Sequence, residues 1–118
     1  MYLVVFEVEI KNNLIKDYLS HAQALLPVLD ETPGLLSVER FNSLKHAQKL
    51  LSLSFWEEPD SIALWRNNSA HRLAQLSGRN DIFSDYRISV AHIDRQYTFR
   101  ARKNAPDDSN RYFSIPIV

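Results

Sequence analysis

Two aromatic side chains that could act on one ligand, Trp65 and His71, stand six positions apart in the sequence. A histidine ring exchanges a proton near neutral pH, and a tryptophan ring packs against flat aromatic ligands. On one continuous helix the two side chains would point roughly 120° apart, because each residue turns the helix by about 100°. Asn67, Asn68 and Ser69 are poor mid-helix residues, since their side chains compete for backbone hydrogen bonds. The sequence therefore predicts a helix break at 67–69 that brings Trp65 and His71 to one site.

Each residue of this predicted site has a functional and a structural interpretation. His71 is expected in the first turn of the second helix, where the helix dipole disfavours a charged ring and leaves a neutral proton acceptor; otherwise it is a surface histidine. Trp65 either stacks on a ligand or anchors the core. Asn68 caps the second helix, contacts the ligand, or does both. The predicted catalytic residues are His71, Trp65 and Asn68.

The stretch 49–56 adds predicted pocket residues. As a strand, it carries Leu51, Leu53 and Phe55 on one face, and Leu50, Ser52, Ser54 and Trp56 on the other. Small hydroxyl side chains between large apolar ones suit a pocket wall, although they equally suit a half-exposed face. Tyr86, further along the chain, either lines the cavity or belongs to the core. The predicted lining residues are Ser52, Ser54, Phe55 and Tyr86.

Apolar periodicity predicts the elements that position these residues. Strands are expected at 2–10, 35–41, 49–56 and 82–99, and helices at 14–29, 60–66 and 70–77. Asn12 or Asn13 is expected to cap the first helix, and Gly78 to end the last one in a left-handed conformation. Pro27 is expected to loosen the end of the first helix. A change of apolar parity near Ala91–His92 indicates a bulge or a change of surroundings.

The order strand, helix, strand, strand, helix, strand is that of the ferredoxin-like split βαβ fold. This α+β fold has an antiparallel sheet with both helices on one face. The other face would leave a large apolar surface exposed, so a face-to-face homodimer is expected. The domain is expected to span 1–99. The tail, 100–118, is polar with an apolar end at 112–118, and is expected to be partly mobile or docked on the partner subunit.

Composition excludes several classes of function. The chain of 118 residues has no cysteine, which excludes disulfides and thiolate metal sites. Basic and acidic residues number 14 each, so no net charge favours nucleic acid. Two glycines exclude glycine-rich phosphate loops. His92 and Asp94 lack the second histidine of an iron site, so no metal is predicted. No apolar run reaches the roughly 20 residues of a membrane helix, and a cytoplasmic protein without membrane partners is expected.

Several motifs occur in an order that resembles a known family. They are Val4-Val5-Phe6-Glu7-Val8, Pro33-Gly34-Leu35, Leu51-Ser52-Leu53-Ser54-Phe55-Trp56-Glu57, Trp65-Arg66-Asn67-Asn68-x-x-His71, Gln75-x-x-Gly78-Arg79, Ile82-Phe83-x-Asp85-Tyr86 and Arg95-Gln96-Tyr97. Together they resemble the antibiotic-biosynthesis monooxygenase group of dimeric α+β barrels, and the resemblance ends near Phe99.

This resemblance implies the ferredoxin-like fold, the dimer and three readings of function. The first is a cofactor-independent monooxygenase acting on a small aromatic or quinol-like substrate, because members of the family convert polycyclic phenols to quinones. The second is haem binding and degradation. Relatives that degrade haem use an asparagine on the first strand, and the stretch Tyr2–Ile10 contains none. The third is a dimer that binds a small molecule without catalysis. No cofactor is expected, with haem as the alternative.

Overall fold

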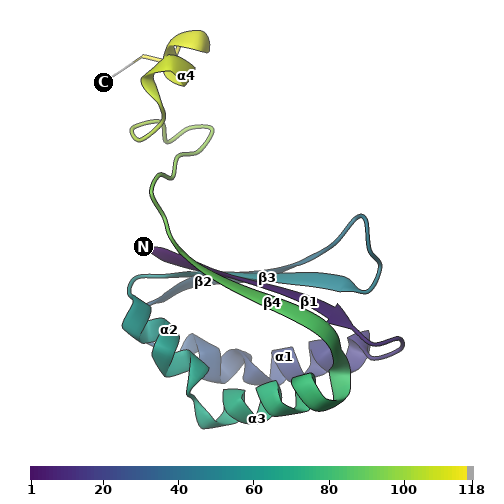
Figure 1. Cartoon of the computed structure of the whole chain (residues 1–118). Coiled ribbons are helices and arrows are strands. Elements are labelled where there is room, and N and C mark those ends of the chain that lie inside the picture. Colours follow the sequence, from purple (N-terminus) through teal and green to yellow (C-terminus); the bar gives the residue numbers. More distant parts are fainter. Residues whose placement is uncertain (117–118) are drawn as a thin grey trace.

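Four strands form one antiparallel sheet in the order β2–β3–β1–β4. The computed structural model describes residues 1–116. The strands are β1 (Tyr2–Ile10), β2 (Leu35–Asn42), β3 (Lys49–Trp56) and β4 (Phe83–His92). This strand order, with the helices on one face, confirms the predicted ferredoxin-like α+β fold (Figure 1).

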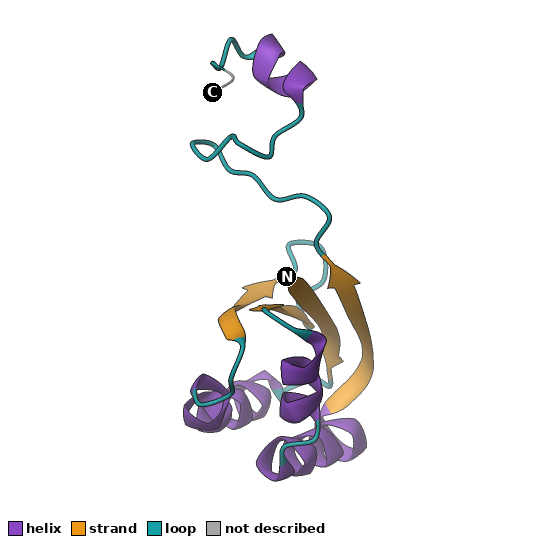
Figure 2. Cartoon of the chain, turned by 90° about the vertical axis from the view of Figure 1, so that its left-hand side faces the viewer, coloured by secondary structure: helices purple, strands orange, loops and turns teal. Residues whose placement is uncertain are grey.

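The helices that cover the sheet follow the predicted order. They are α1 (Ile15–Asp30), α2 (Pro59–Arg66) and α3 (Ser69–Ser77), and a short π-helical turn, η1 (Gly78–Ile82), joins α3 to β4. All three lie on the same side of the sheet (Figure 2). No helix within residues 1–116 is long and apolar enough to cross a membrane.

The alternation of side chains along β1 decides which face of the sheet is buried. Tyr2, Val4, Phe6, Val8 and Ile10 point to the helices, because alternate residues of a strand share a face. The helices close two separate groups of buried residues over this face. The Ile10 cluster contains Val8, Ile10, Tyr18, Leu50 and Ile82, and the Trp56 cluster contains Leu29, Trp56 and Ile62.

The first helix begins differently from the expectation. Leu14 occupies the N-cap position and no side chain caps the helix, so the prediction that Asn12 or Asn13 caps it is wrong. Asn13 instead takes a left-handed conformation, with φ of 67°, which asparagine tolerates better than most residues. The side chain of Asn12 accepts a hydrogen bond from Gln48. Pro27 does not end the helix, which continues to Asp30.

Gly78 does not end α3 in a left-handed conformation, and that prediction is also wrong. Its φ of −59° is right-handed, and the chain continues helically through η1. Glycine is needed here for a different reason. A Cβ atom on Gly78 would lie 2.5 Å from the ring of Phe83, so a side chain would collide with the aromatic ring.

The last strand is shorter than the predicted region 82–99. β4 ends at His92, and the backbone N–H of Ile93 donates to the carbonyl of Met1. The β1–β4 register shifts between Glu9 and Ile10 and not near Ala91–His92, so a bulge there is wrong, while the alternative, a change of surroundings, agrees with the end of the strand at His92. The chain then leaves the sheet and carries a short helix, α4 (Asp107–Tyr112). Ile117 and Val118, the end of the predicted apolar segment, lie outside the described residues.

Candidate functional site

The predicted break between Trp65 and His71 is present. α2 ends at Arg66 and α3 begins at Ser69. Asn68 is the N-cap of α3, and its side-chain oxygen accepts a hydrogen bond from the backbone N–H of His71 at 3.2 Å. This bond satisfies one of the backbone donors that every helix start leaves free. The capping role of Asn68 is therefore confirmed.

The break brings the rings of Trp65 and His71 into direct contact. Their centroids are 4.0 Å apart and their planes are 16° from parallel, so the rings are stacked. Both side chains are half-buried, and Trp65 also packs against the Trp56 cluster. One face of Trp65 is therefore occupied by His71 rather than left free for a ligand.

A hydrogen bond orients the imidazole of His71. Its Nδ1 lies 2.9 Å from the carbonyl oxygen of Trp65. A carbonyl oxygen can only accept, so we assign the proton of the neutral ring to Nδ1. The side chain of Gln75, 3.1 Å from the same nitrogen, donates to the carbonyl of Arg66 and accepts from Arg72. This arrangement leaves Nε2 of His71 as the unprotonated, basic nitrogen.

Burial lowers the pKa of His71 below its ordinary value of 6.5. The hydrogen bond to the Trp65 carbonyl opposes this shift, and the positive charge of Arg72 adds to it. The lowered pKa favours the neutral form of the ring. Loss of water around the ring is the largest cause of the shift.

The sheet beneath the helices carries small residues between the two core clusters. Ser54 pairs with Val4 of β1, which in turn pairs with Val90 of β4. Ser52 pairs with Phe6, which pairs with Ile88, so each serine lies in a row of residues that crosses the sheet. Val4 of the Ser54 row packs against the Trp56 cluster, and Phe6 of the Ser52 row packs against the Ile10 cluster. At β4 the two rows end in apolar side chains that remain exposed to solvent, since Ile88 is 57% and Val90 is 55% exposed. The helices therefore leave these two positions of β4 uncovered.

The other predicted lining residues lie apart from this region. Phe55 points to the opposite face of the sheet, in the row of Leu3, so it cannot line the same space as Ser52 and Ser54. Tyr86 packs on Phe6 and Phe83 beside the Ile10 cluster, whereas Trp65 belongs to the Trp56 cluster.

The hydroxyl groups near the site already have partners in two cases. Ser54 accepts a hydrogen bond from the indole N–H of Trp56 at 2.8 Å. The hydroxyl of Tyr86 accepts one from the guanidinium of Arg79. These bonds hold the side chains in place, while the hydrogen-bonding capacity left on Ser54 still faces the helices.

Two residues at the site escaped the sequence analysis. Gln75 contacts His71, and the signal was available, because residues four apart on a helix are neighbours. Arg40 lies opposite Ser52 on the helix side of β2, and its Nε is buried without a hydrogen-bond partner in the part of the chain that the structure describes. The sequence could have predicted this position, because Arg40 and Val38 are two residues apart on one strand and therefore point to the same face. A buried, unpaired donor of this kind suits an anionic group.

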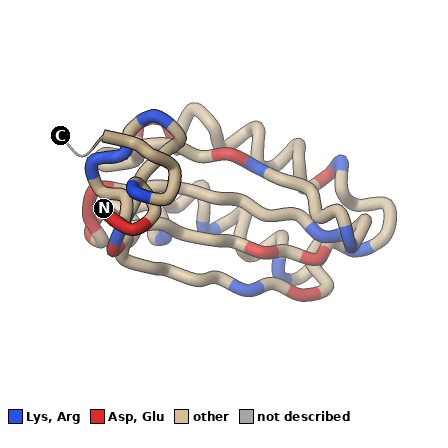
Figure 3. Tube along the Cα trace, turned by 90° about the horizontal axis from the view of Figure 1, so that it is seen from above, with Lys and Arg blue, Asp and Glu red and all other residues tan. Residues whose placement is uncertain are grey.

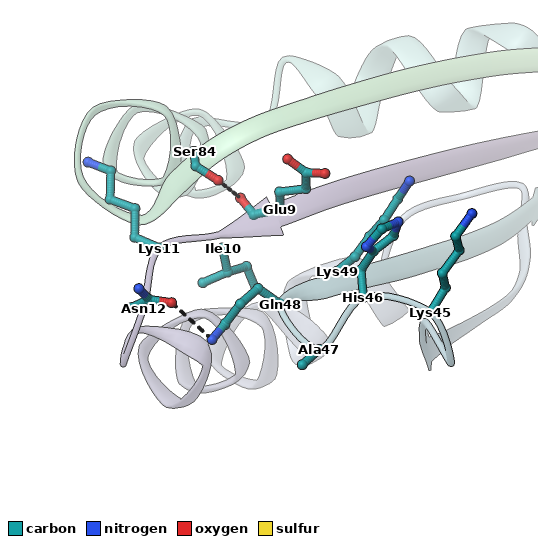
Figure 4. A pocket seen from close by; sticks show the side chains of 10 residues that line it. All are labelled: Glu9, Ile10, Lys11, Asn12, Lys45, His46, Ala47, Gln48, Lys49 and Ser84. Atoms are coloured by element: carbon teal, nitrogen blue, oxygen red, sulfur yellow. Dashed lines mark hydrogen bonds between the residues drawn. The ribbon is translucent and has the colours of Figure 1, made fainter.

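One cavity lies away from these residues. It has a volume of about 680 Å³ at the end of β1 and beside the β2–β3 connection (Figure 4). Its lining is mostly charged or amide side chains, which suit water better than an apolar ring. The residues that line it are Glu9, Ile10, Lys11, Asn12, Lys45, His46, Ala47, Gln48, Lys49 and Ser84. The candidate site is therefore placed at the stacked pair and not in this cavity.

A second cavity involves one predicted residue. Its volume is about 370 Å³, and its lining includes Tyr86 together with charged residues of the sheet face turned away from the helices. Within residues 1–116 no group of three or more histidine, aspartate or glutamate side chains lies close enough to hold a metal ion. His92 packs edge-on against Tyr2, with ring centroids 5.0 Å apart.

Comparison with protein families gives a direct match. The model described as antibiotic biosynthesis monooxygenase matches residues 1–76. The chain belongs to this family. The matched part contains β1 through α3, so it includes Trp65, Asn68 and His71.

Two curated family relatives are similar over most of this chain. The jasmonate monooxygenase ABM of Pyricularia oryzae (strain 70-15) is 33% identical over 93 residues, which is 79% of this chain and 43% of that protein. The uncharacterized protein YqjZ of Bacillus subtilis (strain 168) is 30% identical over 104 residues, 87% of this chain and 88% of that protein. The chain thus spans less than half of the first relative.

Solved structures support the fold. A crystal structure described as an antibiotic biosynthesis monooxygenase matches with a TM-score of 0.67 and 17% identity, over 79% of this chain and 98% of that one. At this identity the match concerns the arrangement of β1 to β4 and their helices, and it says nothing about the substrate.

Proposed function

We propose that this protein is a cofactor-independent monooxygenase that acts on a small phenol or quinol. The observation that supports the proposal best is the Trp65–His71 pair. It holds the imidazole by its Nδ1 and leaves Nε2 as the basic nitrogen of the ring. A base of this kind can take the proton of a phenol and produce the electron-rich phenolate.

The reaction needs no further reductant. Once deprotonated, the phenol itself supplies four electrons to dioxygen. One oxygen atom forms a new carbon–oxygen bond to the ring, the other leaves as water, and the product is a quinone. The protein then contributes the proton acceptor and a site from which water is largely excluded.

The proposed roles follow from the contacts. His71 is the base, and Asn68 positions it by capping the turn that carries it. Trp65 positions the same ring through the stack and through its carbonyl group. Ser52 and Ser54 offer hydroxyl groups to the substrate oxygens. Arg40, with its unpaired Nε, would hold an acidic group on the substrate.

We also propose that the protein works as a homodimer through the face of the sheet opposite the helices, here called the open face. Its middle carries apolar residues of β1 and β3, with Glu39 of β2 paired to Leu53, and other charged residues of the strands gather toward one end (Figure 3). There Glu7 binds Arg87 and Lys49. The apolar residues of the open face are Leu3, Val5, Phe41, Leu51, Leu53 and Phe55. Packing two such faces would remove this surface from water.

Oxygen uptake by the purified protein tests the proposed reaction. The wild type is expected to consume oxygen with members of a panel of phenols and quinols, including acidic ones. The variant His71→Ala is expected to lose about 10²- to 10⁴-fold in kcat, the usual contribution of a general base. His46→Ala is the matched control, because His46 lies on the exposed β2–β3 connection. Equal rates in the wild type and His71→Ala would refute the role of His71.

A haem titration separates the alternatives. A saturable Soret band that disappears in His71→Ala would identify a haem protein and overturn the cofactor-independent reaction. Quenching of tryptophan fluorescence by phenols without oxygen uptake would indicate a binding protein without catalysis.

A further inference from the structure

The segment after β4, residues 94–116, is here called the C-terminal arm. It contains α4 and carries exposed aromatic side chains, with Phe99 at 88% and Tyr112 at 82% exposure. It lies beyond the residues matched by the family model. The dimensions of the molecule, 52 × 34 × 20 Å, and its radius of gyration of 17.4 Å reflect this projection. A compact chain of this length would have a radius of about 13 Å.

The arm has its own internal structure. Asn110 is 4% exposed, and its side chain both accepts a hydrogen bond from the Arg102 guanidinium and donates to the Arg102 carbonyl. The guanidinium of Arg102 also lies 5.0 Å from the ring centroid of Tyr97. Ala105 is buried, and its backbone N–H donates to the carbonyl of Arg102. A flexible linker or an unstructured tail would not need such internal contacts.

The arm makes no such contacts with the rest of the chain. The bond from Ile93 to Met1 is the last one at the sheet, and within residues 1–116 every hydrogen bond of the arm stays inside the arm. Its order is therefore local, and its aromatic side chains are not covered by the domain from which it emerges.

The direction of the arm points to its binding partner. Figures 1 and 2 both show the arm on the side of the sheet opposite α1, α2 and α3, which is the side of the open face. A second copy seated on that face would lie beside the arm. The charges agree with this placement, because residues 94–118 carry five basic and three acidic residues, whereas residues 1–93 carry nine basic and eleven acidic ones.

We propose that the C-terminal arm of each copy packs against the second copy of a dimer. The inference rests on the proposed dimer through the open face. In a two-fold dimer both arms make the same contact, so each copy is held by the face of the sheet and by the partner's arm. Phe99, Tyr112 and Phe113 supply the apolar contacts of the arm.

Photo-crosslinking of the full-length protein tests the proposal. A benzophenone amino acid replaces Phe99 or Tyr112 in a copy with one tag, which is mixed with copies that carry another tag. The same label at Leu44, on the exposed β2–β3 connection, gives the background for random collision. Crosslinks between the two tags, above the Leu44 background and lost on dilution to monomer, are the expected result.

The other outcomes are distinguishable. Crosslinks from the arm to its own chain, or background yield in a protein that is dimeric, would overturn the docking of the arm and leave the dimer standing. A monomer at every concentration would overturn both, while the role of His71 is decided separately by oxygen uptake.

As a second readout, the full-length variant Phe99→Ser/Tyr112→Ser/Phe113→Ser is expected to raise the dimer dissociation constant at least about tenfold. A dimer dissociation constant equal to that of the wild type would contradict the proposal.

Discussion

At the scale of single residues, the orientation of His71 is decided by three contacts. Its ring stacks on Trp65, its Nδ1 donates to the Trp65 carbonyl, and its backbone N–H donates to Asn68. These contacts hold the ring in one orientation, as the proposed proton transfer would require. They also exclude water from the ring, and this loss of water lowers the pKa of His71.

The lowered pKa of His71 predicts how stability depends on pH. In the unfolded chain the ring gains a proton near its ordinary pKa of 6.5, whereas in the folded protein it does so only at lower pH. The unfolded state therefore binds more protons in that window, and acid favours unfolding. The contribution is fully present above pH 6.5 and is lost as the pH falls through the folded value. Urea midpoints from about pH 7 to about pH 5 should fall more in the wild type than in His71→Gln.

The exposed His46 provides the control for this measurement. His46→Gln should keep the pH dependence of the wild type, because it leaves His71 untouched. Parallel curves for the wild type and His71→Gln would mean that the ring gains its proton equally readily in both states. Protonation of His71 should also limit the reaction at acid pH, since the rate of oxygen uptake should decline as His71 becomes charged.

At the scale of elements, the junction between α2 and α3 is the feature that builds the site. Side chains bridge the break, since Asn67 donates to the carbonyl of Ala63 and accepts from Arg72, while Gln75 donates to the carbonyl of Arg66. The break is therefore a fixed corner whose backbone groups are satisfied. Its geometry, more than the identity of either helix, places His71 over Trp65.

Removal of the cap tests this corner. Asn68→Ala should destabilise the protein by about 1 kcal/mol, because the first turn of α3 loses its hydrogen-bond acceptor. It should also reduce kcat, since that turn carries His71. Asn68→Ser retains an acceptor and should restore most of the stability. Urea unfolding and oxygen uptake measure the two effects, and a serine variant as unstable as the alanine variant would show that capping is not the role of Asn68.

At the scale of the whole molecule, the sheet has one face covered by helices and one apolar face left open. An open face of this kind favours a symmetric dimer, and in the proposed dimer the arm of each copy would lie beside the other. The charged group of Glu7, Lys49 and Arg87 sits at one end of that face. The hydrogen bond from Arg87 lowers the pKa of Glu7, with help from the charges of Arg87 and Lys49. These charges would orient the two copies relative to each other.

A charge in the middle of the open face tests the dimer. Leu53→Glu should raise the dimer dissociation constant at least about 100-fold, because two-fold symmetry would bury the carboxylate twice. Leu73→Glu is the control, since Leu73 is exposed on α3, away from the open face. Light scattering after gel filtration gives the mass of each variant. A dimeric Leu53→Glu variant would place the interface elsewhere.

Much of this arrangement was predictable because it depends on neighbours in sequence. Alternation identified β1 and β3, and three- and four-residue spacing identified α1. The break at 67–69 followed from the local chemistry of asparagine and serine. Helix periodicity and capping involve residues within one or two turns, so the sequence contains the information directly.

Features that depend on distant packing were predicted wrongly or missed. Gly78 serves the approach of Phe83 rather than a left-handed turn, and β4 ends at His92 because the sheet offers no partner further on. Phe55 shares a strand with Ser52 and Ser54, yet the helices cover only the serine face.

By itself the sequence determined the fold, the corner between two helices and the pair of residues at that corner. Only the tertiary structure decided that the rings of Trp65 and His71 stack, that Nδ1 of His71 faces a carbonyl, and that burial keeps the ring neutral. The physical reason is that these properties depend on solvent exclusion and on the relative placement of helices and sheet. Both arise from contacts between residues that the sequence keeps far apart.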